Sequence, residues 1–289
     1  MKIRKAIIPV AGMGTRFLPA SKAQHKEMLA VVDKPIIQYI VEEAVAAGIE
    51  EIIFVTAIGK RAIEDHFDRN FELEYRLEQK NKIKELEQIK SIGKLAKFAF
   101  VRQNKPLGDG HAVLAALPFI DQHEPVAVLF GDDIIDAKVP AIKQLMNVYD
   151  KYGDPVVALM KVSKKMVPSF GVIDGKKVDK NTWQINHFVE KPPLNEAPSD
   201  LIVIGQYVLT PEVLELLKTT PPGQDGEIRL AGAFDLLLQK NRALYGCVFD
   251  GTWYNCGNKL GFLMAQVEFG MKHPEVGKDF KKYLKKILG

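Results

Sequence analysis

The chain has 289 residues, of which 47% are hydrophobic and 26% are charged, enough for one large α/β core or two modest domains. Forty Lys and Arg against thirty-six Asp and Glu leave a formal charge of +4 without a basic stripe, which argues against a nucleic-acid partner. The two cysteines fit neither a zinc spacing nor a secreted disulfide framework, and no uncharged window approaches the roughly 18 apolar residues of a membrane span. We therefore expect a cytoplasmic protein without a membrane partner.

The first half of the chain alternates short β-branched runs with segments of helical period. Strands are predicted at 6–10, 52–56, 98–101, 126–130 and 156–162, and helices at 36–47, 61–67, 111–117 and 141–152. Gly48, Pro118 and Gly153 mark the ends of three of these helices. The charged segment 71–90 predicts an exposed helical insertion. Strand and helix in alternation indicate a parallel sheet covered on both faces.

The second half is less regular. Strands are predicted at 171–174, 183–189, 201–209 and 243–249, and helices at 212–217 and 228–239. Residues 259–288 predict two helical segments separated near His273-Pro274, the last amphipathic and suited to packing on its own domain or on another subunit. The predicted fold class is α/β, with a Rossmann-like mixed, mostly parallel sheet flanked by helices and a C-terminal helical segment.

A glycine-containing loop follows the first strand and reads Ala11-Gly12-Met13-Gly14-Thr15-Arg16, with Lys26-Glu27-Met28-Leu29 ten residues later. Glycines at the carboxyl edge of a parallel sheet let backbone N–H groups approach phosphate oxygens. Phe17-Leu18-Pro19 replaces the third glycine of a dinucleotide fingerprint, and the Gly-Lys-Ser/Thr of a P-loop is missing. An Arg and a Lys along this loop suit the charge of a triphosphate.

These motifs resemble bacterial UTP–glucose-1-phosphate uridylyltransferases, which are sugar nucleotidyltransferases. The resemblance begins with the stretch Lys5–Gln38. It continues in order through Arg102–Gly108, Gly131–Asp133, Ser169–Ile173, Phe188–Pro192 and Gly226–Ile228, and so covers nearly the whole chain. It implies a nucleotide-diphospho-sugar transferase fold, UTP and glucose 1-phosphate as substrates, UDP-glucose and pyrophosphate as products, and Mg²⁺ as cofactor.

The resemblance assigns the nucleotide-binding residues. The loop over the phosphates corresponds to Ala11, Gly12, Gly14 and Arg16, and the lysine facing the phosphates corresponds to Lys26. Arg16 and Lys26 would offset charge on the leaving pyrophosphate. Gln103 corresponds to the glutamine that reads the uracil edge, and Gly108 to its backbone partner. Taken singly, Arg16 and Lys26 are equally typical of surface basic residues, and Gln103 is equally typical of a solvated loop residue.

The metal and sugar residues are assigned in the same way. Asp132 corresponds to the magnesium-binding aspartate, with the adjacent Asp133 as the alternative. Glu190 and Lys191 correspond to the pair that holds the sugar hydroxyls and the 1-phosphate, and Gly171 to the glycine under the sugar ring. A surface ion pair before Pro192 is the competing interpretation of Glu190 and Lys191, because successive strand residues face apart.

Three positions depart from the family pattern. His25 stands where proline is usual, and Asp109 where an apolar residue is common. Asn255 stands where the family has a second carboxylate near the metal, so it keeps an oxygen but loses the charge. Asn255 is therefore the second candidate metal residue, and its presence puts the strength of metal binding in doubt.

The resemblance also divides the chain and implies a homodimer or homotetramer. Residues 1–250 form the catalytic core, with a nucleotide-binding part at about 1–135 and a sugar-binding part at about 136–250, and residues 251–289 form a C-terminal helical extension. Two other functions stay open: the same reaction on another nucleotide or sugar 1-phosphate, or a weakly active regulatory paralogue, supported only by Asn255. A nicotinamide oxidoreductase is disfavoured by the glycine pattern.

Overall fold

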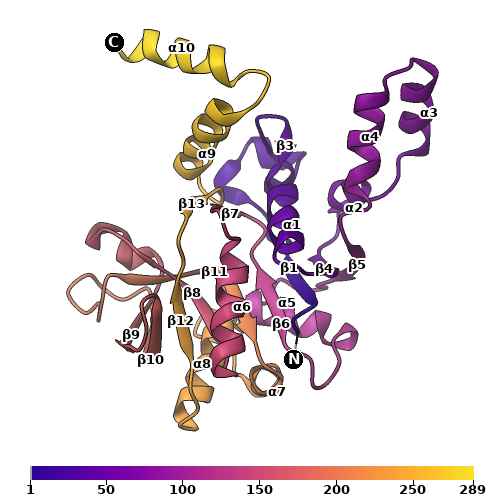
Figure 1. The fold of residues 1–289 in the computed structure, drawn as a ribbon. Helices are drawn as coiled ribbons and strands as arrows, with labels where there is room; N and C mark the ends of the chain where they lie inside the picture. Colours follow the sequence, from indigo (N-terminus) through magenta and orange to yellow (C-terminus); the bar gives the residue numbers. More distant parts are fainter. Residues whose placement is uncertain (1) are drawn as a thin grey trace.

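A mixed nine-stranded sheet forms the centre of the computed structural model, which describes residues 2–289 (Figure 1). Only the first residue of the predicted core 1–250 lies outside the described residues. The strand order is β5-β4-β1-β6-β11-β8-β12-β10-β9. The first four of these are the parallel strands β1 (Lys5–Pro9), β4 (Glu51–Thr56), β5 (Lys97–Arg102) and β6 (Val126–Leu129). The predicted β-branched runs of the first half are thus confirmed as strands.

The other strands turn the parallel sheet into a mixed one. They are β8 (Val156–Lys161), β9 (Gly171–Lys177), β10 (Thr182–Glu190), β11 (Leu201–Leu209) and β12 (Tyr245–Val248). β11 runs antiparallel to both β6 and β8, β12 runs parallel to β8, and β10 runs antiparallel to β12 and β9. The mixed α/β class is therefore confirmed, with the parallel pairs concentrated in the first half of the chain.

Helices cover both faces of the sheet, as the alternation along the chain predicts. On one face lie α1 (Ile36–Ala46) and α6 (Ala141–Tyr152), in the same hydrophobic cluster as Ile8. On the other face lie α5 (Asp109–Ala116), α7 (Pro211–Thr219) and α8 (Leu230–Gln239), in the cluster that contains Ile7. Ile7 and Ile8 are both fully buried because successive strand side chains point to opposite faces. The site loops rise from this two-sided core.

Two helical pieces stand away from the sheet (Figure 1). After α2 (Arg61–Phe67), the charged insertion is a hairpin of α3 (Phe71–Gln79) and α4 (Ile83–Ile92). Asn81 lies between them with a φ of 53°, a left-handed conformation that asparagine tolerates and that ends the first helix. The C-terminal part contains α9 (Lys259–Lys272) and α10 (Gly277–Leu288), which confirms the predicted break near His273-Pro274.

Short elements complete the chain around the site. β2 (Ala30–Val31) pairs with β3 (Lys34–Pro35), and β7 (Asp133–Asp136) pairs antiparallel with β13 (Thr252–Asn255). Short 3-10 helices occur at η1 (Thr15–Phe17), η2 (Ala20–Lys22), η3 (Lys26–Met28), η4 (Leu117–Phe119) and η5 (Lys164–Ser169). The pairing with β7 brings the first residues of the proposed extension 251–289 next to the loop after β6.

Candidate active site

A pocket of about 240 Å³ opens at the carboxyl ends of the first parallel strands. It is lined by Pro9, Ala11, Gly12, Lys26, Glu27, Gln103, Pro106, Gly108, Asp109, Ala112, Phe130, Asp132 and Glu227. A second pocket of about 470 Å³ adjoins it and shares Ala11, Gly12, Gln103 and Pro106. Loops after β1, β5 and β6 supply most of this lining, which is where ligands bind in open α/β sheets.

The glycine loop after β1 lies directly on the lysine predicted to face the phosphates. Gly14 has a φ of 66°, and a Cβ built there would lie 3.3 Å from Lys26 Cβ, so a larger residue would press on the lysine. Gly12 faces open space, and the Ser21 hydroxyl donates to the Gly14 carbonyl at 2.8 Å. Arg16, the other predicted cation of this loop, is exposed on η1 and does not line either pocket.

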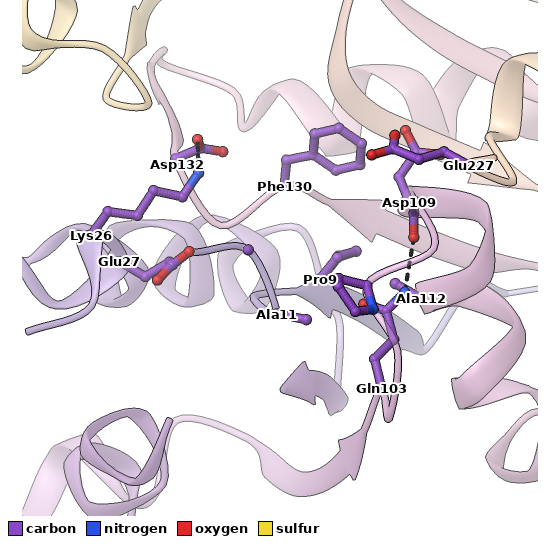
Figure 2. A pocket seen from close by; sticks show the side chains of 13 residues that line it. Pro9, Ala11, Lys26, Glu27, Gln103, Asp109, Ala112, Phe130, Asp132 and Glu227 are labelled. Carbon is purple, nitrogen blue, oxygen red and sulfur yellow. Dashed lines mark hydrogen bonds and ion pairs between the residues drawn. The ribbon is translucent and has the colours of Figure 1, made fainter. Parts of the chain in front are cut away.

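Lys26 and Asp132 meet on one side of the pocket, with Phe130 separating them from Asp109 and Glu227 (Figure 2). Lys26 Nζ lies 2.5 Å from Asp132 Oδ2. Burial lowers the pKa of Lys26, but the Asp132 and Glu27 carboxylates outweigh it and the net pKa is raised, so the ammonium stays charged. The structure therefore presents a fixed positive charge beside a carboxylate.

Beneath Lys26 is a buried ion pair that the sequence reasoning missed. Glu27 and Lys60 are 1% and 4% exposed, and Lys60 Nζ donates to Glu27 Oε2 at 2.9 Å. The pair joins η3 to the start of α2, and Glu27 also lines the pocket. Removing either partner would leave an uncompensated buried charge, so the pair holds the backbone next to Lys26 in place.

The two neighbouring aspartates after β6 have opposite environments. Asp132 lines the pocket, whereas Asp133 is buried at the start of β7. Asp133 accepts hydrogen bonds from Trp253 Nε1 at 2.7 Å and from the Gly205 N–H at 3.1 Å. Burial and the adjacent Asp132 raise the pKa of Asp133 to about 7. Of the two candidates, only Asp132 faces the pocket.

Asn255, the second candidate metal residue, lies beside Asp132. A Cβ built at Gly257 would overlap Asp132 Oδ2 and would lie 3.0 Å from Asn255 Oδ1, so both oxygens border the same small space. The Gly257 N–H donates to Asn255 Oδ1 at 2.9 Å, and the Cys256 N–H donates to the Asp132 carbonyl at 2.8 Å. The β13–β7 pairing thus brings together two oxygens that are 123 positions apart in the sequence.

Gln103 and Gly108 are brought together at the opposite end of the pocket from Lys26. Gln103 Nε2 donates to the Gly108 carbonyl at 3.0 Å and contacts His111 Nδ1 at 2.9 Å. Gly108 has a φ of 102°, and a Cβ there would collide with the Ile228 carbonyl, so this turn requires glycine. With Nε2 engaged, Oε1 of Gln103 is the amide atom that can accept a hydrogen bond from a ligand.

The predicted sugar residues lie on the β9–β10 pair. Glu190 is paired in register with Gly171, and its Oε2 lies 3.1 Å from the position of a Cβ at Gly171. Lys191 has a φ of 47°, and its Nζ lies 3.4 Å from Glu190 Oε1. The left-handed backbone breaks strand alternation after Glu190, so consecutive side chains share one side. None of the three lines the pocket itself, but the Glu190 charge contributes to raising the pKa of Asp109, which does.

Comparisons with known proteins match almost the whole chain. A family model described as nucleotidyl transferase matches residues 5–270. The chain belongs to this family. A UTP–glucose-1-phosphate uridylyltransferase of Staphylococcus epidermidis is 48% identical over 286 residues, 99% of each chain. The structure of a UTP-bound UGPase from Acinetobacter baumannii matches with a TM-score of 0.91 and 40% identity, over 98% of this chain and 99% of that one. A UDP-glucose pyrophosphorylase complexed with UDP-glucose matches with a TM-score of 0.85 and 38% identity, over 94% and 100%.

Three residues of this nucleotidyl transferase depart from the family pattern, and the structure explains two of them, Asp109 and His25. Asp109 is partly buried, and its Oδ1 accepts the Leu230 N–H at 2.9 Å at the start of α8, whose own N-cap residue Arg229 provides no side-chain cap. Burial raises the pKa of Asp109 to about 6, although backbone hydrogen bonds from Leu230 and Gly110 lower it. His25 Nε2 lies 2.6 Å from the Gly59 carbonyl and joins the loop before Lys26 to the one before Lys60.

Among the described residues of this nucleotidyl transferase, 2–289, no three His, Cys, Asp or Glu side chains are arranged to hold a metal ion. Cys247 and Cys256 are both buried and unpaired, and burial raises the pKa of each thiol to about 12. Over the same residues, every helix is too short or too polar to cross a membrane.

Proposed function

We propose that the protein transfers a uridylyl group from UTP to glucose 1-phosphate, giving UDP-glucose and pyrophosphate. The observation that carries the proposal is the single pocket lined by Gln103 and Gly108 at one end and by Lys26 and Asp132 at the other. This spacing suits a base at one end and phosphates at the other. The names of the relatives, a UTP–glucose-1-phosphate uridylyltransferase and UGPases bound to UTP or UDP-glucose, supply the substrate pair.

The base is read by Gln103. Its Nε2 is committed to Gly108 and His111, so its Oε1 accepts the N3–H of uracil. A cytosine has no proton on N3 and would place a lone pair against this oxygen. The same contact admits thymine, and for this reason dTTP is the nucleotide alternative that an assay has to include.

Mg²⁺ is the proposed cofactor, held by Asp132 with the amide oxygen of Asn255. The two oxygens bordering one space fit a hard cation that takes one or two protein oxygens and fills its other positions with phosphates and water. When bound, the ion would neutralise charge on the phosphates. Because Asn255 is uncharged, we propose that the ion depends more on the substrate than in a site with two carboxylates.

The reaction needs no side-chain base. The second pKa of a sugar phosphate lies near 6, so a glucose 1-phosphate oxygen is ionised at neutral pH and attacks the α-phosphorus of UTP in line. The bond from the α-phosphorus to the bridging oxygen breaks, and pyrophosphate leaves. Lys26 and Arg16 offset the charge that develops on it, Lys191 holds the sugar 1-phosphate, and Glu190 and Gly171 hold the sugar ring. The catalysis proposed here is positioning and charge.

A substrate panel tests the proposal. Pyrophosphate release is measured with UTP, dTTP, CTP and ATP, each against glucose, galactose and N-acetylglucosamine 1-phosphates. UTP with glucose 1-phosphate should give the highest kcat/KM. A higher value for dTTP or another sugar phosphate would establish the alternative pair. A purified protein that binds UTP but releases no pyrophosphate with any pair would instead support the weakly active regulatory paralogue.

We further propose that the protein acts in the cytoplasm as a homodimer or homotetramer. Buried, unpaired Cys247 and Cys256 suit a reducing compartment. α9 exposes four apolar side chains at helical spacing, Leu260, Leu263, Met264 and Val267, which suit a subunit contact. Light scattering of the purified protein measures the assembly, and a monomer would contradict this part of the proposal.

A further inference from the structure

Trp253 lies between the metal end and the sugar-phosphate end of the site. It belongs to β13, two residues before Asn255, and its side chain is only partly exposed. Its indole Nε1 donates to Asp133 Oδ1 at 2.7 Å, and Asp133 is bonded through its other oxygen to the Gly205 N–H. Asp133 is the residue next to Asp132. On this side, the indole fixes the backbone that carries the proposed metal carboxylate.

The other side of the indole contacts the turn that holds the sugar residues. Phe170 meets the Trp253 ring edge-on, with 5.6 Å between ring centroids and an interplanar angle of 72°. Phe170 directly precedes Gly171, and its carbonyl accepts the Lys191 N–H at 3.1 Å. The ring therefore packs against the residue that holds the left-handed turn at Lys191.

We propose that Trp253 is a positioning residue that keeps Lys191 and Asp132 at a fixed separation. The proposal rests on the proposed function, in which Lys191 holds the attacking phosphate and Asp132 lies at the triphosphate. In-line attack requires the two phosphates to be aligned, and small displacements reduce the rate steeply. Trp253 contacts Asp133 on one side and Phe170 on the other, and so maintains this alignment without touching either substrate.

The role of the indole N–H can be tested apart from the space that the ring fills. Trp253→Phe keeps an aromatic ring against Phe170 but removes the donor to Asp133, leaving that buried carboxylate with the Gly205 N–H. If the ring only filled space, the Phe variant would lose some stability and nothing else. Trp183, the only other tryptophan, lies on β10 and outside both pockets, so Trp183→Phe is the matched control.

Steady-state kinetics provide the first arm of the test. For Trp253→Phe we expect kcat to fall and the KM for glucose 1-phosphate to rise, together lowering kcat/KM for the sugar phosphate by about tenfold or more, while the KM for UTP changes by less than about twofold. Trp183→Phe should behave as the unmodified protein. Equal kinetics for the two variants would overturn the positioning role. Inactivity of the unmodified protein with UTP and glucose 1-phosphate would overturn the proposed function, and this inference with it.

Fluorescence provides a second arm whose decisive protein, Trp183→Phe, keeps Trp253 and its contacts in place. Trp183→Phe leaves Trp253 as the only tryptophan, and Trp253→Phe leaves Trp183. Titration with UDP-glucose, with binding followed independently by calorimetry, should change the emission of Trp253 in the first protein and leave Trp183 unchanged in the second. Saturating UDP-glucose without any change in Trp253 emission would contradict a ring that contacts both ends of the site.

Discussion

At the scale of single residues, neighbouring positions in the chain have different tasks because the backbone turns between them. Asp132 faces the pocket and Asp133 faces the core, while Glu190 and Lys191 share a side because of the left-handed backbone at Lys191. Strand alternation predicts the opposite directions of Asp132 and Asp133, but it argues against a shared side for Glu190 and Lys191. The roles of such pairs therefore follow from local φ as much as from residue type.

Lys191, the proposed ligand of the sugar phosphate, gives the simplest residue-scale prediction. Lys191→Ala should raise the KM for glucose 1-phosphate by about 10- to 100-fold, since a charge-assisted contact contributes roughly 1.5–3 kcal/mol. UTP binding should be nearly unchanged. Lys177→Ala, an exposed lysine at the far end of β9, is the control. Unchanged kinetics for the sugar phosphate in steady-state assays would remove Lys191 from the site.

Gln103→Glu tests the base end of the pocket. The new carboxylate would place an oxygen against the Gly108 carbonyl, which now accepts from Nε2 at 3.0 Å, and this repulsion would displace the oxygen that accepts the uracil N3–H. We expect UTP affinity to fall by about tenfold or more, as a lost polar contact of roughly 1–3 kcal/mol implies. Calorimetry measures the affinity and thermal unfolding checks the fold. Undiminished UTP binding would mean that the base is read elsewhere.

Asn255→Asp tests the proposed metal end. The carboxylate keeps an acceptor for the Gly257 N–H and adds a charge beside Asp132 at nearly constant volume. We expect the Mg²⁺ concentration for half-maximal rate to fall several-fold, because carboxylate number governs affinity for this cation. Magnesium titrations of both proteins, with thermal stability measured alongside, provide the comparison. An unchanged requirement in a stably folded variant would argue that no ion is held at Asn255.

Much of the site could be predicted one residue at a time, but not the contacts between distant ones. The motifs identify Gln103, Gly108, Lys26 and Asp132, all of which line one pocket. The Glu27–Lys60 pair joins positions 33 residues apart, and nothing local distinguishes it from two surface charges. A lone tryptophan in β13 likewise has no sequence signal for the carboxylate and the ring it contacts.

At the scale of elements, α1 and α6 are joined by a partly buried carboxyl group. Both oxygens of Glu43 in α1 accept from Gln206 Nε2 at 3.0 Å, and Oε1 also accepts the Ile142 N–H at the start of α6. Burial raises the pKa of Glu43 to about 7, against these hydrogen bonds. The packing of α1 against α6 therefore depends on the protonation of Glu43, and so on pH.

The sign of this dependence follows from linkage. The folded protein binds the Glu43 proton more tightly than the unfolded chain, so this contribution is fully present below the unfolded pKa of about 4.5 and is lost as the pH rises through about 7. Glu43→Gln removes the titration, and its unfolding free energy relative to the unmodified protein should improve by on the order of 3 kcal/mol between pH 4.5 and 7.5. Denaturant unfolding across this range measures the difference. Glu42→Gln, whose carboxylate pairs with Lys34 at a partly exposed site, is the control, and a pH-independent difference for Glu43→Gln would contradict the assignment.

Periodicity predicts most elements because it reports which residues face the core. It predicts the strand and helix alternation and the break in the C-terminal helices, but gives only one helical insertion where α3 and α4 form a hairpin. Their amphipathic patterns run on through residues 80–82, and the turn depends on the φ of Asn81. Periodicity also does not give strand direction, because an apolar run has the same pattern whether the strand pairs antiparallel, as β11 does with β6, or parallel, as β12 does with β8.

At the scale of the whole molecule, the site is assembled from both ends of the chain. The glycine loop lies after β1, while Asn255 and Trp253 arrive on β13, which pairs with β7 rather than with the main sheet. The division at residue 250 stays a prediction, but β13 shows that the residues just beyond it contact the pocket loop after β6. A truncation there would remove part of the site along with α9 and α10.

The central claim is that the bond between the α- and β-phosphates of UTP is broken and the uridylyl group moves to glucose 1-phosphate. The most direct measurement follows UTP labelled at the α-phosphorus, with glucose 1-phosphate and Mg²⁺, by chromatography of the products. The account predicts one labelled UDP-glucose and one unlabelled pyrophosphate for each UTP consumed, with the label transfer abolished in Asp132→Ala. Label appearing in UDP or UMP instead of UDP-glucose, or no consumption of UTP by the folded protein, would contradict it.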